Sequence, residues 1–197
     1  LRRTPCGAAN WPAAKCSPLA TPTSRALAAS ANSWPYGGVT SVAVKNGIVA
    51  VASPNADETL NGSIVFFNNN GTFLNQVTVG ALPDMITFSP DVKYIVTANE
   101  GKPNDTYSLD PEGSVSIIDV AANYAVTTLN FAQFSTQLSD LKTKGFRIAS
   151  VSNNFANDIE PEYVTISADS KTAWVTLQEN NGIAKIDLVG KKNVQLF

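Results

Sequence analysis

A phrase of two short strands joined by a tight turn occurs three times along this chain, and it constrains the fold more than any other feature. The three copies occupy residues 39–52, 85–98 and 163–176. A further strand that opens on Gly follows each copy, at residues 62–67, 113–119 and 182–187. Fourth strands are expected over residues 72–77, 124–129 and 193–196. Four short strands per repeat, rich in Val, Ile, Thr and aromatic residues, are typical of β-propeller blades.

The repetition favours a β-propeller over a β-sandwich. A sandwich also has alternating strands, but it gives no reason for one phrase to occur three times. Three blades do not close a ring, because propellers typically have about four to eight. The sequence therefore predicts an all-β fold, a β-propeller fragment of about three four-stranded blades with one helical insertion. The remaining blades would come from the same precursor or from another chain.

A change in composition near residue 35 predicts that the chain has an N-terminal segment distinct from the strand-rich part. Residues 1–35 are rich in Pro and small residues and are expected to form an irregular lead-in to a partial propeller over 36–197. Blades are predicted at residues 36–80, 81–130 and 160–197.

The segment between the second and third blades, residues 131–156, is longer than a blade connection should be. Helical spacing separates its apolar residues Phe131, Phe134, Leu138 and Leu141. This spacing predicts an amphipathic helix over 131–144 that covers one end of the propeller with its apolar face.

Composition excludes several classes of function. The chain has 197 residues and no His, which excludes His-based acid–base catalysis, Ser-His and Cys-His nucleophiles and imidazole-bound zinc. Its 14 Lys and Arg against 16 Asp and Glu give a net charge of −2, without the basic footprint of a nucleic-acid-binding protein. No apolar run approaches the roughly 18 residues of a transmembrane helix. Any chemistry must rest on carboxylates, amides, hydroxyls and a hard cation.

Cysteine and sequon placement indicate an extracellular protein. Cys6 and Cys16 are the only cysteines, and one disulfide closing a short loop suits a secreted protein, with two free thiols as the alternative. Sequons for N-glycosylation occur at Asn61, Asn70 and Asn104, each in a turn rich in Gly or Asn.

The repeat also predicts where the acidic residues gather. Consecutive strands of a blade are antiparallel, so the loop between strands two and three and the connection to the next blade emerge at one end. Asp84 and Glu162 occupy equivalent positions before the innermost strands, and we expect Glu100 and Glu179 to be equivalent at the ends of the second strands. The acids predicted to line this mouth are Asp84, Glu100, Asp110, Glu112, Asp158, Glu160, Glu162 and Glu179.

A ring of carboxylates around a propeller mouth is a candidate site for a hard cation. Ca²⁺ is the favoured ion, because its ligands are oxygens in flexible number. Clustered carboxylates without a cation would repel and raise one another's pKa. The alternative is a solvated acidic rim with no ion, since no EF-hand spacing is present.

Several phrases resemble the choice-of-anchor I domain, which is shared with mesenchyme-specific cell-surface glycoproteins of biomineralising animals. They lie within the match over residues 39–187, at 83–91, 98–101, 110–119, 158–163 and 173–181. The strand–turn–strand units also resemble YVTN-type propeller repeats.

The resemblance implies an extracellular or surface-attached propeller of about seven blades, of which this chain would supply the first three. Some relatives are labelled alkaline phosphatase, and others are linked to calcium mineral. Lys102 stands where relatives usually have an acid, which removes one negative charge from the predicted cation rim. Val92 replaces the usual turn Gly, and its effect is expected at the turn.

Three functions remain open from the sequence. The first is a glycosylated propeller whose acidic face binds Ca²⁺ and contacts matrix, mineral or partner chains. The second is a metal-dependent phosphoesterase, in which Lys102 or Arg147 would contact the phosphate. The third is a scaffold whose acids pair with Lys or Arg of a neighbouring chain. Binding is favoured over catalysis, because no nucleophile and base or complete metal motif can be named.

Overall fold

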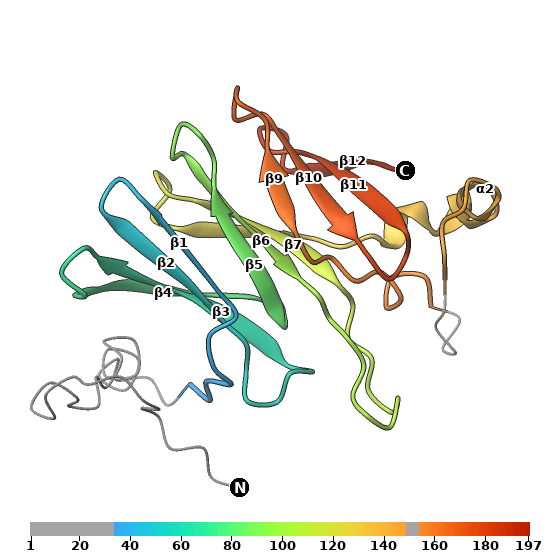
Figure 1. Ribbon diagram of the computed structural model, residues 1–197, viewed down its shortest axis with the longest axis horizontal. Coiled ribbons are helices and arrows are strands. Elements are labelled where there is room, and N and C mark those ends of the chain that lie inside the picture. The colour runs from blue at the N-terminus through green and yellow to red at the C-terminus, as the bar shows by residue number, and fades with distance from the viewer. Residues whose placement is uncertain (1–33, 149–153) are drawn as a thin grey trace, which may run out of the picture.

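The computed structural model describes residues 34–148 and 154–197, and these form three separate four-stranded antiparallel sheets (Figure 1). The first sheet contains β1 (Ser41–Lys45), β2 (Ile48–Ser53), β3 (Asn61–Asn68) and β4 (Phe73–Ala81). The second contains β5 (Pro83–Phe88), β6 (Tyr94–Asn99), β7 (Ser114–Asp119) and β8 (Ala125–Leu129). The third contains β9 (Val164–Ile166), β10 (Thr172–Leu177), β11 (Gly182–Asp187) and β12 (Lys192–Leu196). The predicted all-β fold of four-stranded units is confirmed.

The three first hairpins close with related turns. Asn46 and Gly47 both have positive φ, of 48° and 79°, which suits the tight turns that join twisted antiparallel strands. The second and third turns place Val92 and Ser170 in the left-handed region, with φ of 65° and 61°. A β-branched residue such as Val92 is strained in that conformation.

The sheets pack face to face, and strand alternation decides which side chains enter which interface. On β6, Ile95 points toward the first sheet, where it joins a buried cluster with Phe66 of β3. Its neighbours Tyr94 and Val96 point the other way and pack with the third sheet, beside Ile186 of β11. The second sheet is thus covered on both faces, as a middle blade would be.

The innermost strands β1, β5 and β9 contact one another in succession and lie side by side in the view of Figure 1. The sheets do not close on themselves, so the arrangement is a fragment of a ring. The prediction of an incomplete propeller is confirmed in this sense.

The insertion forms two short helical segments where the sequence predicts one helix over 131–144. A 3₁₀ segment spans Ala132–Gln137, and the α-helix α2 follows at Leu138–Thr143. Phe131 and Phe134 lie three residues apart, the repeat of a 3₁₀ turn, and both are buried in the core that the second and third sheets share. Burial of these two rings therefore decides the local winding, while Leu141 buries the apolar side of α2.

The outer face of the third sheet is open. Strand pairing makes Trp174, Ile183 and Lys185 the counterparts of Val96, Val115 and Ile117 in the second sheet. The three residues of the second sheet have no exposed surface, whereas Trp174 is 36% and Ile183 is 43% exposed. Trp174 packs against Phe197 with ring centroids 5.8 Å apart, and both remain accessible.

Among residues 34–148 and 154–197, no helix is long and apolar enough to cross a lipid bilayer. Cys6, Cys16 and almost all of the predicted lead-in over 1–35 lie outside the described residues, as do positions 149–153 of the insertion.

Candidate functional site

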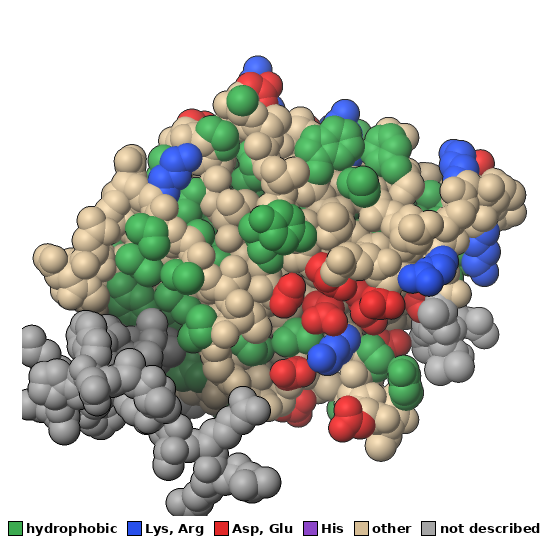
Figure 2. Space-filling model, in the orientation of Figure 1, with side chains coloured by type: hydrophobic (Ala, Val, Ile, Leu, Met, Phe, Trp, Pro, Cys, Tyr) green, Lys and Arg blue, Asp and Glu red, His purple; other side chains and the backbone are tan. Residues whose placement is uncertain are grey.

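Most of the predicted acids meet at one end of the sheets. Asp84 lies at the start of β5, Glu100 directly after β6 and Glu162 two residues before β9. Pro83 pairs with Asn99, so Asp84 and Glu100 leave adjacent strands at the same end of the second sheet. Figure 2 shows a cluster of acidic side chains on this part of the surface, with a basic side chain among them.

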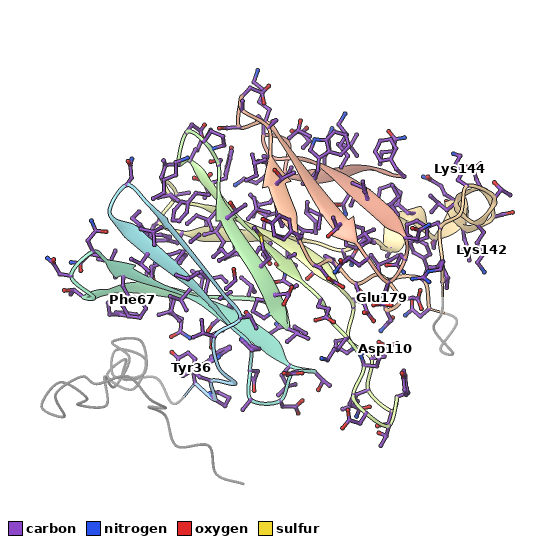
Figure 3. The ribbon with its side chains drawn as sticks, in the orientation of Figure 1. Tyr36, Phe67, Asp110, Lys142, Lys144 and Glu179 are labelled. Carbon is purple, nitrogen blue, oxygen red and sulfur yellow. The ribbon has the colours of Figure 1, made fainter. Side chains whose placement is uncertain are left out.

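The long loop between β6 and β7 and the connection into β9 complete this cluster. Asp110 belongs to the loop, and Asp158 and Glu160 belong to the connection. Figure 3 shows Asp110 and Glu179 on the same side of the molecule, although they belong to the second and third units. We call the set Asp84, Glu100, Asp110, Asp158, Glu160, Glu162 and Glu179 the acidic mouth.

Two glycines allow the loop and the connection to approach closely. Gly101 has φ of 69°, and a Cβ there would lie 2.6 Å from the backbone nitrogen of Gly113. A Cβ at Gly113 would in turn collide with the carbonyl oxygen of Ile159. The two glycines therefore bring the base of the loop against the connection, which places the acids of both segments at the same mouth.

Asn180 fixes the connection to the third sheet. Its side chain is buried, and its Nδ2 donates to the carbonyl oxygen of Asp158 at 2.6 Å and to Oδ2 of Asp158 at 3.1 Å. Its Oδ1 accepts from the backbone N–H of Glu160 at 3.2 Å. Sequence reasoning did not single out Asn180, because nothing in the residue string separates it from the neighbouring Asn181.

Glu160 has a strongly raised pKa. Burial is the largest cause and raises its pKa to about 7 from an ordinary 4.5. The negative charges of Glu100, Glu179, Asp158 and Asp110 act in the same direction. Its carboxyl group therefore changes charge near neutral pH, with four other acids close enough to influence it.

Glu100 and Glu162 are perturbed in the same direction. Burial is the largest cause in both and raises the pKa of each carboxyl. Lys102 partly opposes the rise at Glu100, while the charges of Asp84 and Glu162 add to it. At Glu162 the further causes are the charges of Asp84 and Glu179. These influences link all seven acids of the mouth.

Lys102 and Glu58 form an ion pair at the edge of the mouth, with 3.7 Å between Nζ and Oε2. Both side chains are about half exposed, so the pair contributes little to stability. Glu58 lies in the loop between β2 and β3 and was outside the predicted set. It belongs to a loop of the same type as the one that carries Asp110.

Two placements differ from the sequence expectation. Glu112 lies apart from the mouth, over a groove between the first and second sheets, where its Oε2 accepts from Nδ2 of Asn130 at 3.1 Å. Strand pairing matches Asn99 to Leu177, so Glu179 lies one residue beyond the position equivalent to Glu100. Asp84 and Glu162 do hold equivalent positions before β5 and β9.

The donor set of the mouth suits a hard cation, because every side chain in it offers carboxylate oxygens. In the described part of the chain, no three acids lie in an arrangement that would already coordinate a metal ion. Coordination would require the side chains of the loop and the connection to move toward one another.

The three sequons lie on the first and second units. Asn61 begins β3, Asn70 lies in the exposed turn before β4, and Asn104 lies in the loop between β6 and β7. The side chain of Asn104 organises this loop, since its Oδ1 accepts from the backbone N–H of Ser108 at 3.0 Å. Asn70 presents its amide from a turn in which Asn68 makes the capping contacts.

Solved structures with similar folds identify the class of domain. RRP9 WD40 repeats align with a TM-score of 0.52 and 10% identity, covering 84% of this chain and 39% of that chain. A eukaryotic initiation factor aligns with a TM-score of 0.51 and 17% identity, covering 81% and 32%. Hydrazine synthase of Kuenenia stuttgartiensis aligns with a TM-score of 0.50 and 14% identity, covering 75% and 39%.

At these identities the similarity concerns the fold alone. WD40 repeats are propeller blades, so the three sheets define a β-propeller-type domain. The chain spans between 32% and 39% of the length of these three structures. No curated protein matches it in sequence. Residues 15–197 match the choice-of-anchor I domain, and the chain belongs to that family.

Proposed function

We propose that this chain is part of a secreted or cell-surface β-propeller glycoprotein whose acidic mouth binds Ca²⁺ and contacts matrix, mineral or a partner chain. The observation that carries the proposal is Glu160, a half-buried carboxyl whose pKa rises to about 7 among four other acids. Ionising it costs free energy unless a cation offsets the repulsion. Ca²⁺ fits because it accepts oxygen ligands in variable number and geometry, which suits carboxylates that come from several chain segments.

The Ca²⁺ proposal is tested by thermal unfolding of the chain in chelator and with added Ca²⁺. A ligand present at about one hundred times its Kd stabilises by about 2.7 kcal/mol, or about 5–10 °C in Tm for a chain of this size. We expect Glu160→Gln to fold and to lose most of this shift. The matched control is Asp140→Asn, which removes an exposed acid of α2 outside the mouth. An unchanged Tm of the original chain on adding Ca²⁺ would contradict the proposal.

A second candidate is a metal-dependent phosphoesterase. It is supported by a groove of about 430 Å³ beside the mouth, in which Lys142 and Arg147 lie next to Glu179. The Nε of Arg147 already donates to the carbonyl oxygen of Glu179 at 3.1 Å, so part of this cation is engaged. Turnover of a chromogenic phosphomonoester with added Ca²⁺, lost in Glu100→Ala, would favour this reading.

We propose that further blades, from the same precursor or from another chain, cover the outer face of the third sheet. Trp174, Ile183 and Lys185 there are the counterparts of side chains that the next blade buries in the second sheet. The open sheets and the coverage of about a third of the propeller structures support this proposal.

Secretion and glycosylation belong to the same proposal. Choice-of-anchor domains are typically associated with the cell surface or exterior. We propose glycans at Asn61, Asn70 and Asn104 and a disulfide between Cys6 and Cys16. Intact mass before and after enzymatic deglycosylation and reduction checks each modification.

A further inference from the structure

A polar groove of about 400 Å³ lies between the first and second sheets, at their outer strands. Strands β4 and β8 form its sides, and the loop before β7 forms one end. The groove is complete within this chain, because the two sheets that form it are already packed together. Its polar side chains belong to Asn61, Thr78, Glu112, Ser114, Thr128 and Asn130.

A buried hydrogen-bond network supports the floor of the groove. Nδ2 of Asn99 donates to the hydroxyl oxygens of Ser114 at 3.1 Å and of Ser116 at 3.0 Å. The Ser116 hydroxyl lies 3.2 Å from that of Thr128, which faces the groove. Asn99 and Ser116 have no exposed surface, so these groups are held in place before any ligand arrives.

Gly80 keeps the floor open. A Cβ at this position would collide with the Ser114 hydroxyl and approach Nδ2 of Asn99 at 2.9 Å. A side chain there would therefore displace the network and fill the space above it. The Oδ1 of Asn99 is also buried, and it has no hydrogen-bond partner among the described residues.

The lining decides which ligand chemistry fits. Among the residues that the structure describes, no Lys or Arg lines the groove, and Glu112 is acidic, so an anion would be repelled. The described lining contains no aromatic side chain either, so it offers a flat base no stacking surface. An ammonium group offers donors only, and it would leave the amide and hydroxyl donors of the groove without acceptors.

We propose that this groove binds a neutral polyhydroxylated ligand, a pyranose sugar unit. Sugar hydroxyls both donate and accept, which matches three hydroxyls, two amides and one carboxylate. The volume lies within the range of small-ligand sites. The sugar has two sources: a glycan attached to Asn61, whose residue lines the groove, or a saccharide carried by a partner. The proposal does not depend on Ca²⁺ binding at the mouth.

The test is a nuclear magnetic resonance titration of the unglycosylated chain with N,N′-diacetylchitobiose, glucose and methyl mannoside at millimolar concentrations. We expect backbone amide shifts at Gly80, Ser114 and Asn130 with at least one sugar. Thr128→Val removes one hydroxyl at nearly constant shape, and we expect about tenfold weaker binding. The matched control is Thr127→Val on the neighbouring position of β8, which we expect to bind as before.

Two results would overturn the proposal. One is the absence of shifts in the groove with all three sugars. The other is a groove that responds to propylammonium and not to sugars, which would assign it to cationic ligands.

A further variant separates the two sources of sugar. Ser63→Ala removes the Asn61 sequon while leaving Asn61 in place, and the Ser63 hydroxyl is buried without a partner, so its loss should be tolerated. Both proteins are produced in a host that glycosylates. If the glycan attached to Asn61 occupies the groove, the Ser63→Ala variant binds free sugar and the original chain does not. If a partner supplies the sugar, both forms bind it.

Discussion

The position of Glu160 in the fold makes ionisation of its carboxyl group unfavourable. Asn180 holds the backbone of its connection through the N–H of Glu160 and the carbonyl oxygen of Asp158, which anchors Glu160 beside its acidic neighbours. Burial together with these neighbours raises its pKa to about 7. The same residue would be an ordinary acid on an exposed loop. Its behaviour depends on which chain segments meet at the mouth.

The pH dependence of stability follows from this shift. The folded-state pKa of Glu160 lies above its unfolded value of 4.5, so its contribution to stability is fully present below pH 4.5 and is lost as pH rises through about 7. In chelator we expect Tm to fall between about pH 5 and pH 8, with Glu100 and Glu162 acting in the same direction. Glu160→Gln should flatten the slope, as thermal melts across this range would show. An equal slope in the variant would contradict this assignment.

Among the structural elements, the turn between β5 and β6 contains the clearest local strain. Val92 has φ of 65°, a conformation that costs a β-branched residue about 1–2 kcal/mol. Val92 is also partly buried against the core between the first and second sheets. We expect Val92→Gly to change the free energy of unfolding by less than about 0.5 kcal/mol, because relief of strain is offset by the entropy cost of Gly and by the lost packing. Urea denaturation measures the change.

The third sheet provides a control for this prediction. Ser170 occupies the equivalent turn position with φ of 61°, but its hydroxyl accepts from the backbone N–H of Asp91 at 3.0 Å across the interface. Ser170→Gly should therefore lower stability, by about 1 kcal/mol. A loss for Val92→Gly as large as that for Ser170→Gly would show that the backbone conformation does not decide the effect.

Elements were predicted well where local pattern decides them. Alternation of Val, Ile and Thr around short turns indicates the strands, and β11 spans the predicted residues 182–187. The helix was less well predicted, because burial of Phe131 and Phe134 favours a 3₁₀ segment that spacing alone does not reveal. Asn180 could not be found for a similar reason, since its partners lie twenty or more residues away in sequence.

In the candidate site, too, the acids at strand ends could be predicted from the sequence, whereas the position of Glu112 in a long loop could not. Antiparallel topology is enough to gather Asp84, Glu100 and Glu162 at one end. The position of Glu112 depends on how the loop from Glu100 to Gly113 folds back, which strand order does not determine. Repeats therefore predict positions at strand ends and lose accuracy within long insertions.

At the scale of the whole molecule, the second sheet is covered on both faces and the third on one. Val96 has no exposed surface, whereas Trp174 at the equivalent position is 36% exposed and lies beneath Lys185, whose Nζ is 5.4 Å from the ring centroid. The same strand position thus has two environments in one chain. This difference in exposure shows that no blade covers the outer face of the third sheet in the described part of the chain.

Matched substitutions at these two positions test whether the outer face is open. We expect Val96→Thr to cost about 1–3 kcal/mol, because it buries a hydroxyl without a partner. Trp174→Thr should cost about 1–2 kcal/mol in this chain, less than in a closed ring, because 36% of Trp174 remains exposed. Denaturant unfolding of both variants gives the comparison.

A loss for Trp174→Thr as large in this chain as in a longer protein would mean that the third sheet is already covered. If further blades complete the ring, Trp174→Thr in the longer protein should cost about 3–5 kcal/mol, as loss of a buried aromatic side chain does. The cost of Val96→Thr should not change between the two proteins, because both neighbours of the second sheet are present in this chain. The same variant distinguishes further blades in the same chain from blades supplied by a separate chain. Only with a separate chain should the stability lost in Trp174→Thr depend on protein concentration.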